Sequence, residues 1–450
     1  MRASIGQRLA GLCVLALAIV SISAPQAGAV PAFAAQTGLA CQACHVGGFG
    51  PQLTPTGREF KLNGYTLRTK SFSVPFSAMV VASYLRTQQP QNPPPAPNFS
   101  PNDNFALDQV SLFFAGGFGD HFGAFVQGTY DGVAEAWHWD NLDLRAVDKI
   151  KVKSADVTLG LSLNNAPTVQ DVWNTLPAWG YPYTTSTLAP APSTSPLLNG
   201  ALAQTSMGLT GYAWINSEYY LEAGAYWSPG AGLLSDLGAD PTSPGSIAGG
   251  APYARIAYQH DVGPGTLEVG AYGMWTQIHP GLDFSTGMTD GYADYGLDGS
   301  YVATLPNTDV FSVNARFLHE HQSLNATCAL LEADSTCASN TLNDVRIDGS
   351  YYWRDKIGLT VAGFDTTGSA NPIIYAANRT FKPDSSGVIV QLDGTPFGAS
   401  NSPLGRRFNT RVGVQYTAYT QFNGASQNWD GLGGNASDNN TFRVFIWAAY

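Results

Sequence analysis

Hydrophobic residues alternate with small or polar residues along most of this chain, with a period of two. From residue 72 onward, one set of alternate positions is apolar: Phe72, Val74, Phe76, Ala78, Val80, Ala82 and Tyr84. The same pattern returns over residues 122–131 and 267–276. Successive side chains of a β-strand point to opposite faces, so these strands present one apolar and one polar face. In a membrane barrel, the two faces are the lipid side and the lumen side.

Turn-forming residues separate the predicted strands by alternately short and long connections. Short turns are expected near Gly119-Asp120, Asp148-Lys149, Asn216-Ser217, Gly263-Pro264-Gly265, Pro306-Asn307 and Arg354-Asp355. Long loops are expected at residues 87–104, 165–205 and 228–251. Outer-membrane barrels have short periplasmic turns and longer extracellular loops. The spacing predicts an all-β fold, a transmembrane antiparallel β-barrel of about 16 strands over residues 71–450.

The last residues support the membrane barrel over a soluble sheet. Phe442, Val444, Ile446, Ala448 and Tyr450 alternate to a terminal aromatic residue, as is typical of outer-membrane barrels. Soluble edge strands usually carry Lys or Pro against aggregation. The alternative is an ordinary edge strand of a soluble β-sandwich.

Composition removes several other classes of protein. Charged residues make up only 12% of the 450 residues, about half of the share usual in soluble domains. The net charge of -11 gives no electrostatic basis for binding nucleic acid. After the first 30 residues, no apolar run reaches the roughly 18 residues that a transmembrane helix needs.

The first 29 residues have the features of a Sec signal peptide. Arg2 and Arg8 precede an apolar stretch, and Ala27-Gly28-Ala29 provides a cleavage site. We therefore expect residues 1–29 to be a signal peptide and the mature protein to reach the bacterial outer membrane.

A Cys-x-x-Cys-His motif follows the signal peptide, at Cys41-Gln42-Ala43-Cys44-His45. This motif indicates covalent attachment of a c-type haem. Two thiols three residues apart on a tight turn reach the two vinyl groups of one porphyrin, and His45 then supplies the proximal ligand. The alternatives are a redox-active thiol pair, which needs a βαβ context, and half of a zinc site, which needs two further ligands nearby. We expect one haem c, bound by Cys41, Cys44 and His45.

The predicted monohaem segment, residues 30–70, is too short to enclose a porphyrin by itself. We therefore expect it to form a plug that uses the barrel to cover the cofactor. Met79 is the favoured second iron ligand, because it falls on a lumen-facing position close to the motif. Met274 also falls on the lumen side, and Met79 has the alternative role of a packing residue. Other candidate ligands are the histidines His121, His138, His260, His279, His319 and His321.

Cys328 and Cys337 lie nine positions apart in a predicted extracellular loop. Exported proteins occupy an oxidising environment, where thiols form disulfides. We expect a disulfide that closes this loop.

Several segments together carry a resemblance to a known family. They are the stretch from Pro31 to His45, Gly57-Arg58-Glu59-Phe60-Lys61, Gly64-Tyr65, and Gln415-Tyr416-Thr417-Ala418-Tyr419-Thr420 with Phe422-Asn423-Gly424. The chain resembles the fused outer-membrane monohaem cytochrome–porins of iron-oxidising bacteria over its whole mature length. The resemblance implies a haem-bearing barrel, and iron(II) oxidation at the cell surface is attributed to some members. The residues after His45 depart from the iron-oxidiser pattern.

These features predict an electron conduit in the lipid of the outer membrane. A haem in the lumen takes electrons from an extracellular donor, such as Fe(II), and passes them to a periplasmic cytochrome c or copper protein. With Fe(II) as donor, the protein is an iron(II):cytochrome c-type oxidoreductase. The alternatives are a porin whose haem plug is structural or gates the pore, and a soluble haem enzyme on a β-sandwich.

Overall fold

A computed structural model describes residues 31–69, 74–334, 337–399, 402–405 and 407–450. The predicted signal peptide, residues 1–29, lies outside the described residues, as does Phe72 at the predicted start of the first strand. Among the described residues, no helix has the length and apolar character that crossing a membrane requires.

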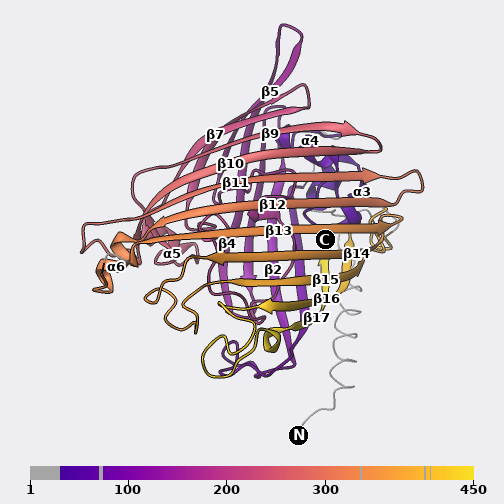
Figure 1. Cartoon of the computed structure of the whole chain (residues 1–450). Coiled ribbons are helices and arrows are strands. Elements are labelled where there is room, and N and C mark those ends of the chain that lie inside the picture. The colour runs from indigo at the N-terminus through magenta and orange to yellow at the C-terminus, as the bar shows by residue number, and fades with distance from the viewer. Residues whose placement is uncertain (1–30, 70–73, 335–336, 400–401, 406) are drawn as a thin grey trace.

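The chain forms one closed antiparallel β-barrel (Figure 1). Sixteen long strands follow one another round the wall, and the three-residue β8 pairs with the end of β10. The barrel closes because β1 pairs with both β2 and β17. The prediction of about 16 strands is therefore confirmed. The strands are β1 (Phe76–Thr87), β2 (Asn104–Phe118), β3 (Phe122–Asp131), β4 (Ala136–Val152), β5 (Ala155–Asn164), β6 (Met207–Ile215), β7 (Tyr219–Trp227), β8 (Gly245–Ile247), β9 (Ala251–Val262), β10 (Gly265–Pro280), β11 (Asp290–Thr304), β12 (Val310–Ser323), β13 (Ser339–Trp353), β14 (Ile357–Gly368), β15 (Ser385–Gly394), β16 (Asn409–Gln421) and β17 (Thr441–Ala449).

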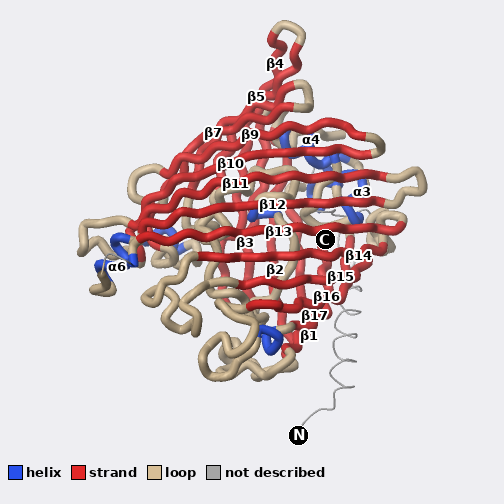
Figure 2. Tube along the Cα trace, in the orientation of Figure 1, coloured by secondary structure: helices blue, strands red, loops and turns tan. Residues whose placement is uncertain are grey.

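Short and long connections alternate along most of the barrel, as the sequence predicts. The exceptions are the short connection between β3 and β4, residues 132–135, and the long one between β15 and β16, residues 395–408. Long loops gather at the end that carries α6 (Asn325–Leu330), where α5 (Ala231–Asp236) also lies (Figure 2). One predicted turn is wrong. Asp148 and Lys149 lie inside β4, and the turn to β5 falls at residues 153–154. The alternation continues to Val152 and its partners on β5, so these charged residues do not end the strand.

The two faces of the wall have the predicted chemistry. On β14, the side chains of Ile357, Leu359 and Val361 point outward and are about half exposed, whereas Thr360 points inward and is 1% exposed. An isolated closed barrel with an apolar exterior satisfies its backbone hydrogen bonds within the wall and buries its outer surface in lipid. The protein is an outer-membrane β-barrel.

Residues 31–69, the N-terminal segment, lie within the lumen. The segment contains α2 (Pro31–Thr37), α3 (Cys41–Cys44), the 3-10 turn η1 (Val46–Gly48) and α4 (Pro55–Leu62), and α3 and α4 lie behind β10–β13 in Figure 1. Thr54 caps α4, because its side chain accepts a hydrogen bond from the Gly57 N–H.

Hydrogen bonds tie the N-terminal segment to strands on several sides of the barrel. Gln52 Nε2 donates to Ser312 Oγ on β12 at 2.9 Å. Tyr65 Oη donates to Asp143 Oδ2 on β4 at 2.6 Å. Asn409 Nδ2, at the start of β16, donates to the Gly48 carbonyl at 2.8 Å. These contacts fix the segment across the lumen.

The connection between β5 and β6, residues 165–206, also folds into the barrel, and we call it the inner loop. It includes the 3-10 turn η2 (Pro177–Trp179), and Trp173 is 1% exposed. Asn174 Nδ2 donates to the Pro51 carbonyl at 3.0 Å and Asn174 Oδ1 accepts from the Leu53 N–H at 2.9 Å. The inner loop and the N-terminal segment therefore pack against each other inside the wall.

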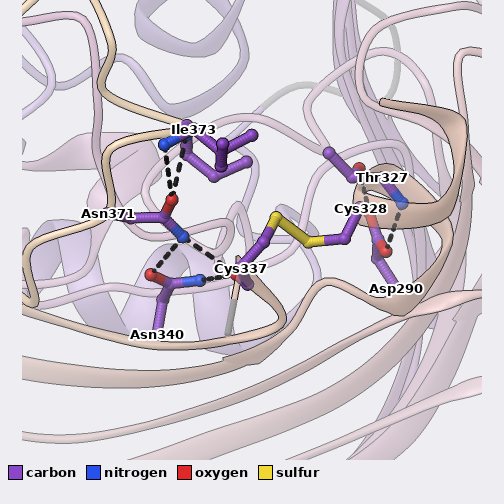
Figure 3. The surroundings of a disulfide bond; sticks show 8 residues. Asp290, Thr327, Cys328, Cys337, Asn340, Asn371 and Ile373 are labelled. Atoms are coloured by element: carbon purple, nitrogen blue, oxygen red, sulfur yellow. Dashed lines mark hydrogen bonds between the residues drawn. A yellow bond between two sulfur atoms is a disulfide. The ribbon is translucent and has the colours of Figure 1, made fainter. Parts of the chain in front are cut away.

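Cys328 and Cys337 form the predicted disulfide in the long loop between β12 and β13, with Cα atoms 5.9 Å apart (Figure 3). The Cys337 carbonyl accepts hydrogen bonds from Asn340 Nδ2 at 2.8 Å and from Asn371 Nδ2 at 2.9 Å. On the other side, the Thr327 N–H donates to Asp290 Oδ1 at 3.0 Å. The disulfide thus closes one loop, and the hydrogen bonds of Cys337 to Asn371 and of Thr327 to Asp290 tie this loop to neighbouring segments.

Candidate functional site

The Cys-x-x-Cys-His motif forms a single helical turn inside the barrel. The backbone of α3 brings Cys41 and Cys44 onto one turn, which closes with a 2.9 Å hydrogen bond from the His45 N–H to the Cys41 carbonyl. Both cysteines are free thiols in the structure. His45 then pairs as an isolated bridge with Leu53, which leads the chain into α4. The motif is therefore held as a compact, ordered unit.

Two glycines let this unit pack closely. A Cβ at Gly57 would lie 2.3 Å from the Cys44 carbonyl oxygen, so α4 rests directly on the motif. Gly47 has φ of +69°, and a Cβ there would lie 2.4 Å from the Tyr352 ring. The Gly47 N–H also donates to Asp355 Oδ1 at 2.7 Å. Both positions require glycine, one for space and the other for space and backbone conformation.

A cavity opens beside the motif, with a volume of about 330 Å³. Cys41, Cys44 and His45 line it together with apolar and aromatic side chains from the N-terminal segment, the wall and the inner loop. The aromatic lining residues are Phe33, Phe49, Phe60, Tyr65, Phe113, Phe125, Trp179, Tyr183 and Trp447. Sites for cofactors are typically concave and mostly apolar, with a few polar groups.

Met79 lines the same cavity, from the first strand of the wall. Its sulfur accepts a hydrogen bond from Trp447 Nε1 at 3.1 Å, and it packs with Trp447 and Phe49. Met274 also points inward and is fully buried, but it belongs to a separate cluster around the inner loop. Among the described residues that line the cavity, Met79 is the sole methionine and His45 the sole histidine.

The electrostatics of the motif do not suit thiol–disulfide exchange. Burial, and then the neighbouring Cys41, raises the pKa of the Cys44 thiol to about 11. Redox-active thiol pairs work with lowered thiol pKa values. The zinc alternative also lacks support, because the described residues contain no group of three or more His, Cys, Asp or Glu side chains placed to hold a metal ion.

The residues fit a covalently bound haem. Burial, and then the charge of Arg411, lowers the pKa of His45 to about 4, so its imidazole is neutral and has an unprotonated nitrogen. His45 Nδ1 is buried and has no hydrogen-bond partner among the described residues. A haem iron would engage the buried imidazole, two thiols lie beside it, and aromatic side chains surround it.

Lys61 is a charged residue of the cavity wall that the sequence analysis does not assign. Its Nζ donates to the carbonyls of Val169 at 2.6 Å and Asp171 at 2.9 Å, and lies 4.8 Å from the centre of the Trp179 ring. Burial, and then the charge of the nearby Arg145, lowers the pKa of Lys61 to about 7. Lys61 thereby binds the inner loop to α4.

Several cavity residues come from parts of the chain far from the motif. These residues include Trp179 and Tyr183 of the inner loop and Trp447 of β17. No local pattern in the sequence marks them as site residues. None of the six candidate histidines lies among the described residues that line the cavity. Of the predicted ligands, the structure thus brings Cys41, Cys44, His45 and Met79 to one cavity.

No protein-family model matches the sequence, and no curated protein matches it. Among solved structures, the chain is similar to the outer membrane channel DcaP of Acinetobacter baumannii, with 11% identity, coverage of 83% of this chain and 96% of that chain, and a TM-score of 0.47. It is also similar to an anion-selective porin from Comamonas acidovorans, with 12% identity, coverage of 84% and 99%, and a TM-score of 0.43. For OmpT of Vibrio cholerae these values are 10%, 86%, 100% and 0.43. The likeness concerns the β-barrel fold alone.

Proposed function

We propose that this protein is an outer-membrane electron conduit that carries one haem c inside its barrel, and that it belongs with the fused monohaem cytochrome–porins. The observation that carries the proposal is the meeting of Cys41, Cys44, His45 and Met79 at one aromatic cavity within a closed wall. The wall is an insulator, so an electron crosses the membrane only through groups held in the lumen.

In this proposal, Cys41 and Cys44 would hold the porphyrin through thioether bonds, and His45 and Met79 would bind its iron. When bound, the haem supplies reversible one-electron transfer at its iron. Gly57 keeps α4 against the motif, so the position of the two sulfur atoms is fixed. The aromatic side chains that line the cavity would exclude water and surround the apolar macrocycle.

The position of the cavity indicates which partner is close to it. Asp355, which binds the Gly47 N–H, lies in the short turn between β13 and β14. Short turns face the periplasm in outer-membrane barrels. A periplasmic cytochrome c or copper protein therefore meets the haem at that end, and the donor, with Fe(II) as the first candidate, acts at the long-loop end.

The first experiment tests for the haem itself. The full chain is produced in a host that exports it and attaches c-type haem, and the purified protein is denatured and stained for covalent haem. Wild type is expected to retain the stain, and the Cys41→Ser, Cys44→Ser double variant to lose it while the barrel still folds. Wild-type barrel without bound haem would overturn the proposal.

The second experiment tests the donor. Oxidised protein is mixed anaerobically with Fe(II), and the haem α-band is followed. Appearance of the reduced band supports Fe(II) as donor. If a strong reductant such as dithionite gives the band and Fe(II) does not, Fe(II) is excluded as the donor.

A channel for solutes is the second candidate function, favoured by the charged inner wall of the closed barrel. Arg255 Nη2, for example, lies 2.7 Å from Asp298 Oδ2 and 3.2 Å from Glu268 Oε1 on the lumen side. Such walls line water-filled channels. Conductance in a planar bilayer tests this function: a large, steady pore in the wild type supports the channel, and a closed barrel that opens only after deletion of residues 31–69 contradicts it.

A further inference from the structure

A line of aromatic side chains runs through the described part of the lumen, from the cavity to a long loop. The line consists of Tyr183, Tyr181, Phe364, Tyr419, Phe422 and Trp429, and we call it the aromatic path. Its members come from the inner loop, from two inward-facing strand positions and from the loop between β16 and β17. They are distant in sequence, so only the fold brings them together.

The inner end of the aromatic path is part of the cavity. Tyr183 lines the cavity and packs against the cluster that contains Phe49 and Trp447. The rings of Tyr183 and Tyr181 meet edge to face, with centroids 5.4 Å apart. A haem held at His45 would therefore share its cavity with the first ring of the path.

The middle of the path crosses from the inner loop to the wall. Tyr183 and Phe364 both pack against the buried cluster of Tyr181, Ala362 and Ile389, and Phe364 projects inward from β14. The centroids of Phe364 and Tyr419 are 5.7 Å apart. Tyr419 is held in place because its Oη donates to the Pro190 carbonyl at 2.8 Å.

The outer end of the path reaches the long-loop end of the barrel. Tyr419 and Phe422 have centroids 5.0 Å apart, and Phe422 and Trp429 have centroids 5.1 Å apart. Trp429 is only partly buried, so its ring is accessible from outside. Its backbone is fixed by a 2.7 Å hydrogen bond to Gly434 and a 2.8 Å hydrogen bond from Arg379.

We propose that the aromatic path is the route by which an electron passes from an extracellular one-electron donor to the cavity. This inference rests on the proposed function. One electron leaves the donor at Trp429 and arrives at the iron(III) of the haem, so the donor is oxidised and the iron reduced by one electron each. Electron transfer slows steeply as the gap between orbitals widens. Rings in contact keep the gaps small at both ends of the path, and the step from Tyr181 to Phe364 runs through the cluster that both share with Ala362 and Ile389. The rings act as a bridge and are not themselves oxidised.

The pair Tyr226 and Tyr253 provides an internal comparison. Their centroids are 6.0 Å apart and both point into the lumen, but they pack around the inner loop with Met274 and do not line the cavity. Replacement of Tyr253 by Leu therefore removes a large buried ring, with a similar loss of packing, and leaves the aromatic path unchanged.

The experiment injects an electron at the outer end by light. Gln427, exposed beside Trp429, is replaced by Cys and labelled with a ruthenium–bipyridine complex. In the haem-loaded protein, Cys41 and Cys44 are blocked by haem, and Cys328 and Cys337 are blocked by their disulfide. After a flash, one electron passes from the excited ruthenium(II) to iron(III), which leaves ruthenium(III) and iron(II). The haem absorbance gives the rate. A second labelled site at exposed Ser285, in the loop between β10 and β11, lies off the path.

In haem-loaded full-length protein, Tyr419→Leu is expected to slow injection from position 427 by about tenfold, equivalent to about 1.4 kcal/mol of activation free energy. Tyr419→Phe, which keeps the ring, and Tyr253→Leu are expected to leave the rate unchanged. Injection from position 285 is expected to be slower and insensitive to Tyr419→Leu. Equal rates in Tyr419→Leu and wild type would overturn the aromatic path while leaving the conduit intact. Absence of covalent haem in the wild type would instead remove the proposed function.

Discussion

The indole nitrogen of Trp447 donates a hydrogen bond to the sulfur of Met79, at 3.1 Å. The two residues lie on β17 and β1, the strands that close the barrel, where Val81 pairs with Trp447 and Met79 with Ala449. The contact orients the thioether within the cavity that the motif lines. The last strand of the barrel thus positions the favoured ligand on the first.

Replacement of Met79 by Leu is expected to change the haem and spare the fold. The two side chains have similar volume, so the cost in stability is less than about 1.5 kcal/mol. Loss of the thioether removes an axial ligand that raises the reduction potential, so a lower potential and a high-spin spectrum are expected. Potentiometry and visible absorption measure both, and Met274→Leu is the matched control. An unchanged low-spin spectrum and potential in Met79→Leu would exclude Met79 as ligand.

Replacement of Gly57 by Ala is expected to disturb the motif without touching a ligand. The added Cβ would lie 2.3 Å from the Cys44 carbonyl oxygen, so α4 must move away. Such overpacking typically costs about 1–3 kcal/mol. We expect less covalent haem per barrel, measured by haem stain against protein mass. Gly250→Ala has open space around its Cβ and serves as control. Full haem loading in Gly57→Ala would contradict the close packing of α4 on the motif.

Because Lys61 is buried, we expect the free energy of unfolding to rise with pH. Its pKa is about 7 in the folded protein and near its usual 10.5 when unfolded, so between these values the unfolded chain binds more protons. The free energy of unfolding therefore rises as pH increases from about 7 to 10.5, by at most about 5 kcal/mol, and this contribution is flat below pH 7. Denaturant unfolding at pH 6.5, 8 and 9.5 measures this rise, because one of these pH values lies below the range and two lie within it.

Lys61→Met is expected to flatten that pH dependence, and exposed Lys151→Met is expected to retain it. The same slope in Lys61→Met and wild type would show that other groups cause it.

Removal of the disulfide is expected to loosen one loop and leave the wall intact. The Cys328→Ala, Cys337→Ala double variant loses a cross-link that is worth roughly 2–3 kcal/mol against an open chain. Limited proteolysis should then cut between β12 and β13 faster, while the barrel resists as before. If the cutting rate stays at the wild-type value, the hydrogen bonds of Asn340 and Asn371 to Cys337 suffice to hold the loop.

The strands of the wall could be predicted from the sequence, because the alternating pattern that defines them is local. The alternation of apolar and polar residues over a few positions decides which face of the strand each side chain lies on. Met79 and Met274 face inward as predicted. The end of a strand depends also on the strand that pairs with it. β4 continues past Asp148 because its partner β5 continues beside it.

The motif could also be predicted, because it consists of five consecutive residues. The residues that surround it could not be predicted. Trp447, Tyr183 and Arg411 approach the motif only after the barrel closes and the inner loop folds inward. Neither period nor spacing marks these residues, and the same holds for Lys61, whose partners are backbone carbonyls of the inner loop.

The placement of the N-terminal segment has a consequence for assembly. Its anchors lie on β4, β12 and β16, and the wall becomes continuous only when Tyr450 at the far end of the chain bonds to Ala78. The closed wall then surrounds Cys41 and Cys44 on every side. In the proposed conduit, haem would therefore be attached before the wall closes, while the exported chain is still unfolded in the periplasm.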